Sequence, residues 1–158
     1  MAIYIKYDGI DGEATHESHK KWLDVASLQW GAGRAIHTPS GSAANREASE
    51  PSVSEVHITK TMDSSSPKFF TEACTGAVGK KVQIHLVTTS NPGKTYAEYT
   101  LTNALVSSYA MNTTGDRPVE TIAISFTKME FKFIPYDNKN MPGSPISVSY
   151  DLSTTKSA

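Results

Sequence analysis

The sequence predicts a mostly β fold, a small barrel of two packed antiparallel sheets with about seven strands and one α-helix. Most segments alternate apolar and polar residues with a period of two, which is typical of strands with one buried face. Residues 64–76 have helical spacing instead. Residues 119–134 change the phase of their alternation, which requires a bulge or a strand that passes between two packed sheets.

The candidate strands follow one another along the whole chain. Residues 3–7 alternate, and residues 22–33 form a second strand in which Ala26, Leu28 and Trp30 are expected on the core face, opposite Val25, Ser27 and Gln29. Residues 56–62 and 82–86 flank the helix. Residues 97–111 are expected to form one long strand with a continuous apolar face, and residues 146–152 form the last strand.

Residues 64–76 carry the markers of a helix at both ends. Ser66 is a good N-cap, and Pro67 lies where its missing N–H does no harm. Gly76 is expected to end the helix in the left-handed conformation. The three- and four-residue steps predict a buried face of Phe70, Ala73, Cys74 and Ala77, with Cys74 as an inert buried thiol.

Composition bounds the class of protein. The 158 residues fit one domain, 1–158, and 15 Lys and Arg against 16 Asp and Glu give a net charge of -1. This balance argues against a nucleic-acid or anionic-membrane binder, which needs a basic surface. The single cysteine excludes an internal disulfide. We see neither a signal peptide nor a stretch that would insert into a membrane, so we expect a soluble protein made in the cytoplasm.

Residues 36–51 have no periodicity and form a long loop for a compact domain. Such a segment is either disordered, which is the default reading, or a docking arm for a partner. Residues 153–158 form a polar tail.

The sequence carries little that resembles catalytic chemistry. We find no serine in a glycine-flanked elbow and no carboxylate pair placed as in a glycosidase, so we predict no enzyme activity and no cofactor. His16 and His19 are too few ligands for a metal, so they are expected in a solvated loop. His57 and His85 are expected as plain surface histidines. An interaction or structural protein fits this composition best.

Several motifs occur together in the order of a known family. They are residues 4–13, 29–31, 46–49, 51–55, 60–67, 115–118, 126–128 and 135–137. With them the chain resembles the haemolysin-coregulated protein (Hcp) family, the tube subunit of bacterial type VI secretion. The resemblance covers nearly the whole length.

The resemblance implies a fold like that of phage tail tubes and a hexameric ring that stacks into a hollow tube. Its partners would be further copies of itself, a spike protein, a contractile sheath and effector proteins carried in the lumen. The subunit would be made in the cytoplasm of a Gram-negative bacterium and secreted by the type VI machine without a cleaved signal peptide. No enzymatic extension follows Leu152, which favours the plain tube role.

The resemblance also implies roles for particular residues. It places Gln29 at a position that faces the lumen, where family members often have a small serine, and Ser27 shares that face. It matches residues 36–51 to the extended loop that reaches neighbouring subunits or rings. The residues that we assign to these inter-subunit or ring-stacking contacts are Arg46, Glu47, Ser49 and Glu50.

Two other classes remain open. One is a monomeric β-barrel that binds a small ligand or carbohydrate in an aromatic cleft, for which Trp22, Tyr96 and Tyr136 are candidates. The other is a secreted toxin with catalysis of an unrecognised kind.

Overall fold

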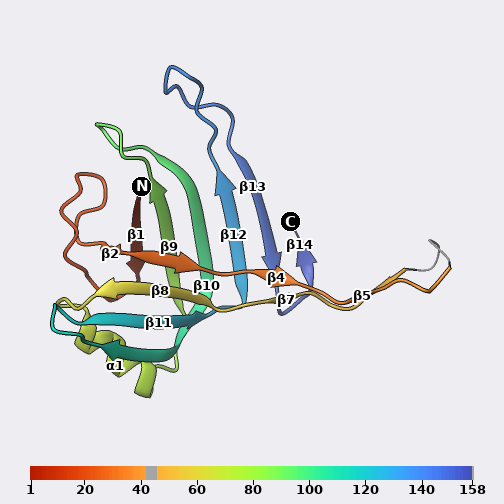
Figure 1. Ribbon diagram of the computed structural model, residues 1–158, viewed down its shortest axis with the longest axis horizontal. Coiled ribbons are helices and arrows are strands. Elements are labelled where there is room, and N and C mark those ends of the chain that lie inside the picture. Colours follow the sequence, from red (N-terminus) through yellow and green to blue (C-terminus); the bar gives the residue numbers. More distant parts are fainter. Residues whose placement is uncertain (42–45, 158) are drawn as a thin grey trace.

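A computed structural model describes residues 1–41 and 46–157, and its chain is mostly β with one helix, as predicted (Figure 1). The elements are β1 (Ala2–Tyr7), β2 (Leu23–Val25), β3 (Ser27–Gln29), β4 (Ala32–Gly33), β5 (Ile36–His37), β6 (Glu47–Ala48), β7 (Ser52–Val53), β8 (Val56–Thr61), α1 (Ser66–Thr75), β9 (Lys80–Val87), β10 (Thr95–Asn112), β11 (Val119–Ser125), β12 (Lys128–Phe133), β13 (Ile146–Asp151) and β14 (Lys156–Ser157).

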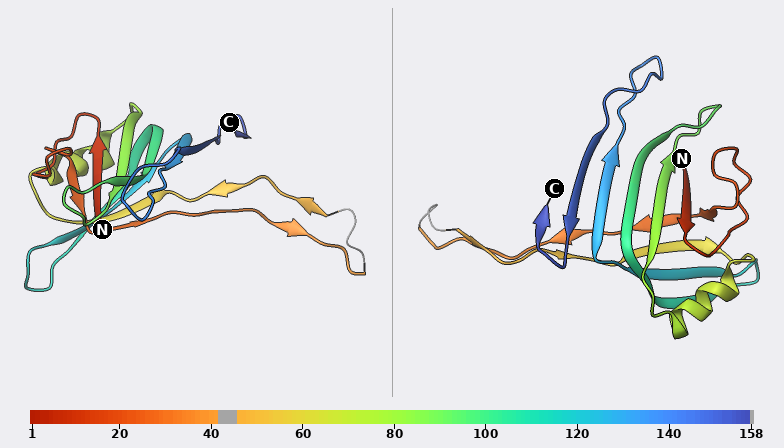
Figure 2. Two further views of the ribbon diagram at one scale, coloured as in Figure 1. Left: turned by 90° about the horizontal axis from the view of Figure 1, so that it is seen from above. Right: turned by 180° about the vertical axis from the view of Figure 1, so that it is seen from behind.

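The body consists of two antiparallel sheets joined at their corners (Figures 1 and 2). The first sheet has the order β2-β1-β9-β10-β12-β13-β14, and the second has the order β3-β8-β11-β10. Within the described residues no continuous ladder closes the barrel. Instead, β10 belongs to both sheets, and the chain passes from one sheet to the other between β2 and β3.

The core lies between the two sheets and is made of aliphatic side chains from both. Its fully buried members include Ile5, Leu23, Val56, Ile58, Val82, Leu101, Ile122 and Ile124. Helix α1 covers the edge of this core, because Phe69 is fully buried and packs edge-on against Tyr7 at 5.4 Å between ring centroids. Alternation therefore identified the core-facing positions of β1, β8 and β9 correctly.

Strand β10 bends in its middle, so the expectation of one continuous apolar face is wrong. Its pairing with β9 shifts register between Leu101 and Ala104, where Asn103 has φ 55°. Gly79 of the facing segment fits there because a Cβ atom would collide with the Asn103 side chain. Beyond the bend Ala104 is buried, whereas Met111 is 50% exposed.

The predicted strand 22–33 is also interrupted. Val25 is buried and Ala26 is exposed, the reverse of the prediction. The cause is a corner at Ala26, whose N–H donates to the Thr59 carbonyl at 2.7 Å. After this corner Leu28 and Trp30 turn toward the core, as predicted.

The helix exists, but three details of its prediction are wrong. The N-cap position is Ser65 rather than Ser66, and it makes no side-chain capping bond. Gly76 has φ −63°, so it is not left-handed. The buried face carries Ser66 and Phe69, while Phe70 is 58% exposed and Cys74 is exposed.

The predicted phase change in residues 119–134 is confirmed. Ile122 and Ile124 of β11 are buried, and so is Met129 of β12. Between them the chain leaves the second sheet, where β11 pairs with β8, and enters the first, where β12 pairs with the first half of β10.

Residues 31–41 and 46–54 form an arm that projects from the body (Figure 2). Its outgoing and returning segments pair as β4 with β7 and β5 with β6. The described part of the predicted loop 36–51 is therefore an extended ribbon rather than a disordered segment. Residues 42–45 of this loop, and residue 158 of the tail 153–158, lie outside the described residues. In the tail, β14 pairs with β13. Among residues 1–41 and 46–157, no helix has the length and apolar character that crossing a membrane requires.

Candidate assembly surfaces

The outer face of the second sheet is polar and almost without charge. Ser27 and Gln29 are exposed on β3, and their cross-strand neighbours on β8 are Thr59 and His57. The row continues to Thr121 of β11, which is also exposed. Small polar side chains of this kind make a smooth surface that offers hydrogen bonds and no fixed charge.

Gln29 lines a hollow of about 440 Å³ at one end of this face. Trp30, Ser54 and His57 also line it. The Ser54 hydroxyl accepts a hydrogen bond from the Gly31 N–H at 2.8 Å, which fixes the rim where β3 leads into the arm. The structure thus brings Ser27 and Gln29 to one exposed surface.

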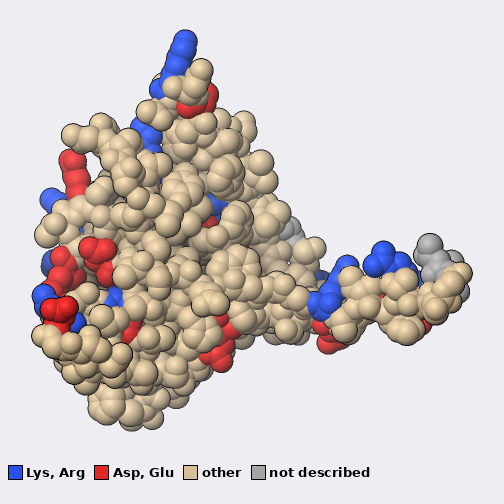
Figure 3. Space-filling view, in the orientation of Figure 1, with Lys and Arg blue, Asp and Glu red and all other residues tan. Residues whose placement is uncertain are grey.

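The arm is held together by hydrogen bonds between its outgoing and returning strands. The Ser49 N–H donates to the Ala35 carbonyl at 2.8 Å, and the Ser49 hydroxyl accepts from the Ala35 N–H at 2.9 Å. Arg46 Nε donates to the Thr38 hydroxyl at 3.1 Å. Arg46, Glu47, Ser49 and Glu50 are all exposed, so the predicted contact residues lie together on one projecting ribbon. Figure 3 shows that both signs of charge occur along it.

An apolar groove of about 350 Å³ lies where the arm leaves the body. Trp30 and Val53 line it from the arm side, and Met129, Phe131 and Tyr150 line it from β12 and β13. The neighbouring strand surface is apolar as well, since Ile146 is 62% exposed and Val148 is 56% exposed. Apolar surface of this extent on a strand near a sheet edge is typical of a protein–protein contact.

A second apolar surface lies at the other end of the body, beside α1. Phe70 and Tyr109 pack edge-on at 6.2 Å between centroids and line a hollow of about 350 Å³ together with Met62 and Pro67. Val119 is 41% exposed. This surface differs in composition from the groove at the arm root.

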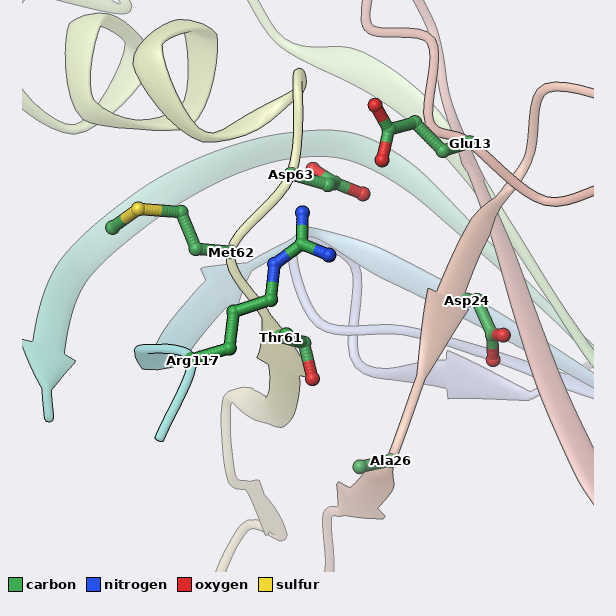
Figure 4. Close-up of a pocket in the computed structure, with 7 residues that line it drawn as sticks. All are labelled: Glu13, Asp24, Ala26, Thr61, Met62, Asp63 and Arg117. Atoms are coloured by element: carbon green, nitrogen blue, oxygen red, sulfur yellow. The ribbon is translucent and has the colours of Figure 1, made fainter. Parts of the chain in front are cut away.

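A polar pocket of about 310 Å³ lies between β2, β8 and the turn after β10 (Figure 4). The guanidinium of Arg117 points into it toward Asp63, and Glu13 and Asp24 flank it. This pocket connects two motifs of the sequence, residues 60–67 and 115–118, in space.

Asp63 belongs to a buried charge cluster that the sequence analysis missed. Lys60 is fully buried, and its Nζ lies 2.9 Å from Asp63 Oδ1 and 3.2 Å from Glu120 Oε2. The contact with Glu120 meets the distance of an ion pair but lacks the geometry of a hydrogen bond. Ser66 donates to the other oxygen of Glu120. Burial raises the pKa of Asp63, but hydrogen bonds from Ser65 and Lys60 outweigh it and lower that pKa overall.

Two histidine predictions are wrong. His19 is only 4% exposed, and its ring lies within hydrogen-bonding distance of both His16 and His85, so this loop is not simply solvated and His85 is not a plain surface residue. His57 is exposed, as expected. Within residues 1–41 and 46–157, no group of three or more His, Cys, Asp or Glu residues is arranged to hold a metal ion.

The aromatic candidates for a ligand cleft have separate partners. Trp22 packs against His19 and His85 at 4.7 and 4.6 Å between centroids. The Tyr96 hydroxyl lies 2.6 Å from the Met1 sulfur, and the Tyr136 hydroxyl donates to the Thr95 carbonyl at 3.0 Å. Each ring is therefore engaged within the body.

Comparison with known proteins gives consistent matches. A sequence profile for the family described as "Type VI secretion system effector, Hcp" matches residues 4–133. No curated protein matches the chain. A solved type six secretion system protein is 31% identical, covers 99% of both chains and has a TM-score of 0.93. Hcp1 from Salmonella typhimurium is 23% identical over 99% of this chain and 98% of its own, with a TM-score of 0.77.

A further solved structure, a type VI secretion system effector from Yersinia pestis, is 25% identical over 94% of this chain and 98% of its own, with a TM-score of 0.76. The profile match covers most of the chain, and the fold agrees throughout. The chain therefore belongs to the Hcp family of type VI secretion.

Proposed function

We propose that this chain is the structural tube subunit of a type VI secretion system and is not an enzyme. Copies of it assemble into hexameric rings, and the rings stack into a hollow tube. The tube is secreted with its spike protein by a contractile sheath and carries effector proteins in its lumen. Membership of the Hcp family is the observation that carries this proposal.

The two apolar surfaces support a ring. In a cyclic assembly each subunit uses two different patches, one for each neighbour. The groove at the arm root and the surface beside α1 differ in composition and lie apart on the body. A two-fold dimer would instead use one self-complementary patch.

The structure of the arm supports a role in contacts with neighbouring subunits. A two-stranded ribbon is marginal in water without a third strand or a packed face. The side chains of Arg46, Glu47, Ser49 and Glu50 are exposed, so we assign them to contacts with a neighbouring subunit or ring. These contacts would order the ribbon in the assembly.

We assign the polar face to the lumen wall. Ser27 and Gln29 present hydrogen-bonding groups without fixed charge, which suits transient retention of protein cargo. A tube that bound its cargo through buried apolar surface or paired charges would release it slowly.

Light scattering coupled to size exclusion, with negative-stain electron microscopy, tests the assembly. We expect a mass close to six chains and annular particles. A strict monomer at high concentration would contradict the tube and favour the ligand-binding barrel. Arg46→Glu is expected to reduce the ring or stacked fraction, whereas Arg46→Lys keeps the charge and retains it. Equal assembly of both variants would remove the assigned role of Arg46.

Cargo retention tests the lumen assignment. Gln29→Arg places a charge on the polar face, so we expect intact rings that retain less of a co-expressed effector, while Gln29→Asn retains the wild-type amount. Identical retention by Gln29→Arg would show that this face does not meet cargo.

A further inference from the structure

Three imidazole rings form a continuous chain between a loop and the first sheet. His19 Nδ1 lies 2.9 Å from His16 Nδ1, and His19 Nε2 lies 2.9 Å from His85 Nδ1. His16 and His19 belong to the loop between β1 and β2, whereas His85 belongs to β9. The loop is therefore fastened to the sheet through side chains.

The ring of His19 is buried against two aromatic rings. Tyr4 stacks on it with 4.8 Å between centroids and 14° between planes, and Trp22 packs against it edge-on at 4.7 Å. The loop also has a backbone ladder of its own, in which Ala14 N–H donates to the Trp22 carbonyl and Lys21 N–H to the Ala14 carbonyl, both at 3.0 Å. The closed loop is thus a defined structure that excludes water from His19.

The loop contacts Tyr4 and His85, which belong to a cross-strand row of titratable groups. Asp24, Tyr4, His85, Glu98 and Lys132 are successive neighbours across β2, β1, β9, β10 and β12. Burial lowers the pKa values of both His19 and His85, and the charge of Glu98 opposes this shift without reversing it. Lys132, which lies 3.5 Å from Glu98, adds to the lowering at His85. Glu98 is therefore already paired with a cation.

The chain of three histidine rings can hold only a limited number of protons while both N···N contacts persist. Each N···N contact needs one N–H, because an imidazole nitrogen either donates or accepts. Three neutral rings satisfy both contacts, and one added proton is also accommodated if the outer rings carry hydrogens on their remaining nitrogens. A second added proton would place two N–H groups face to face. The closed chain therefore takes up one proton at most without losing a contact.

Burial of the rings also disfavours protonation of the closed histidine chain. Burial, with smaller contributions from His85 and His16, lowers the pKa of His19 to about 4, and burial lowers that of His85. A single metal ion does not fit this closed arrangement, because His19 directs opposite ring nitrogens at its two neighbours. The chemistry that remains is proton uptake.

We propose that residues 11–22 form a pH-sensitive latch, closed over the Tyr4–His85 face at neutral pH and released in mild acid by proton uptake on the histidine chain. Once the loop is open, the imidazoles of His19 and His85 titrate in water near their ordinary value of about 6.5. Below that pH the open form binds more protons than the closed form, so the open population rises as the pH falls toward 4.

Hydrogen exchange of the full-length protein tests the latch. The readout is the protection factor, corrected for intrinsic exchange, of the amides of Ala14, Lys21 and Trp22 at pH 7.5 and 5.0. The pKa of His19 alone predicts about a 30-fold loss of protection at pH 5.0. Core amides of β9, such as Ile84, should change by less than threefold. Equal protection of the loop at both pH values would overturn the proposal.

Two variants separate the latch from general acid sensitivity. His19→Gln removes the central titrating ring, so loop protection should be lower at pH 7.5 and should then change by less than threefold between the two pH values. His57→Gln removes an exposed histidine outside the chain and should keep the 30-fold change. A 30-fold loss that persists in His19→Gln would contradict the assignment. The wild-type measurement stands by itself if the variant fails to fold.

Discussion

The body buries its apolar side chains between two sheets, whereas among the described residues of the arm only Val53 packs against the core. Phe69, Val56 and Leu101 are fully buried in the body, but Ile36 in the arm is 49% exposed. The arm is held by backbone pairing and a few exposed hydrogen bonds, such as those of Ser49. Burial of apolar surface dominates folding stability, so the body should fold without the arm, and the arm should depend on contacts made elsewhere.

The buried charge cluster of the body is one of two places where the largest effects are expected. Lys60→Met should lower the free energy of unfolding by about 3–5 kcal/mol, because it leaves Glu120 and Asp63 without their cation. Urea unfolding measures this loss. The double variant Lys60→Met with Glu120→Leu is the control and should recover much of it. A loss of less than about 1 kcal/mol in the single variant would mean that the cluster is hydrated.

Two adjacent phenylalanines of α1 give a matched pair. Phe69→Ala should cost about 3–5 kcal/mol, because the side chain is fully buried against Tyr7. Phe70→Ala should cost less than about 1 kcal/mol in the isolated subunit, because the side chain is 58% exposed. Urea unfolding of both variants checks the difference. Similar losses would mean that the buried face of α1 is assigned wrongly.

A smaller and local effect is expected in the arm. Ser49→Ala removes the hydroxyl that accepts from the Ala35 N–H, and exposed hydrogen bonds of this kind contribute about 0.5–1 kcal/mol. The exchange rate of the Ala35 amide should rise by about two- to fivefold. Exchange in β9 should not change. An unchanged rate at Ala35 would mean that the ribbon is open in solution.

The smallest effect on folding should come from removing most of the arm. Replacing residues 35–49 with a short Gly-Ser linker should change the free energy of unfolding of the isolated body by no more than about 0.5 kcal/mol. Ring or tube assembly should nevertheless fail. Urea unfolding and light scattering measure the two outcomes. A large loss of stability would show that the arm contributes to the core.

The sequence predicted the body well wherever a strand has one buried and one exposed face, because apolar and polar residues then alternate along it. Strands 3–7, 56–62 and 82–86 and the phase change near Phe126 were all readable. The same alternation places Lys60 and Glu120 at inward positions, so the buried charge cluster could have been found from the sequence. Two inward charges of opposite sign on different strands are the signature of such a pair.

Other features depend on contacts that no local pattern contains. The corner at Ala26 and the bend at Asn103 change the facing of later residues without a break in composition. Phe69 and Phe70 are equally apolar, and the choice between them depends on tertiary contacts such as that of Phe69 with Tyr7. His19 meets a partner 66 residues away. The sequence of the arm shows no alternation because nearly all positions of its described strands are exposed to solvent.

The sharing of β10 between both sheets has a mechanical consequence. This strand runs 18 residues from Thr95 to Asn112 and pairs with β9 and β12 before its bend and with β11 after it. A push on one sheet is therefore transmitted to the other along covalent bonds, and separating the sheets would require shearing several ladders at once. In the tube that we propose, every subunit would contribute this resistance to shear.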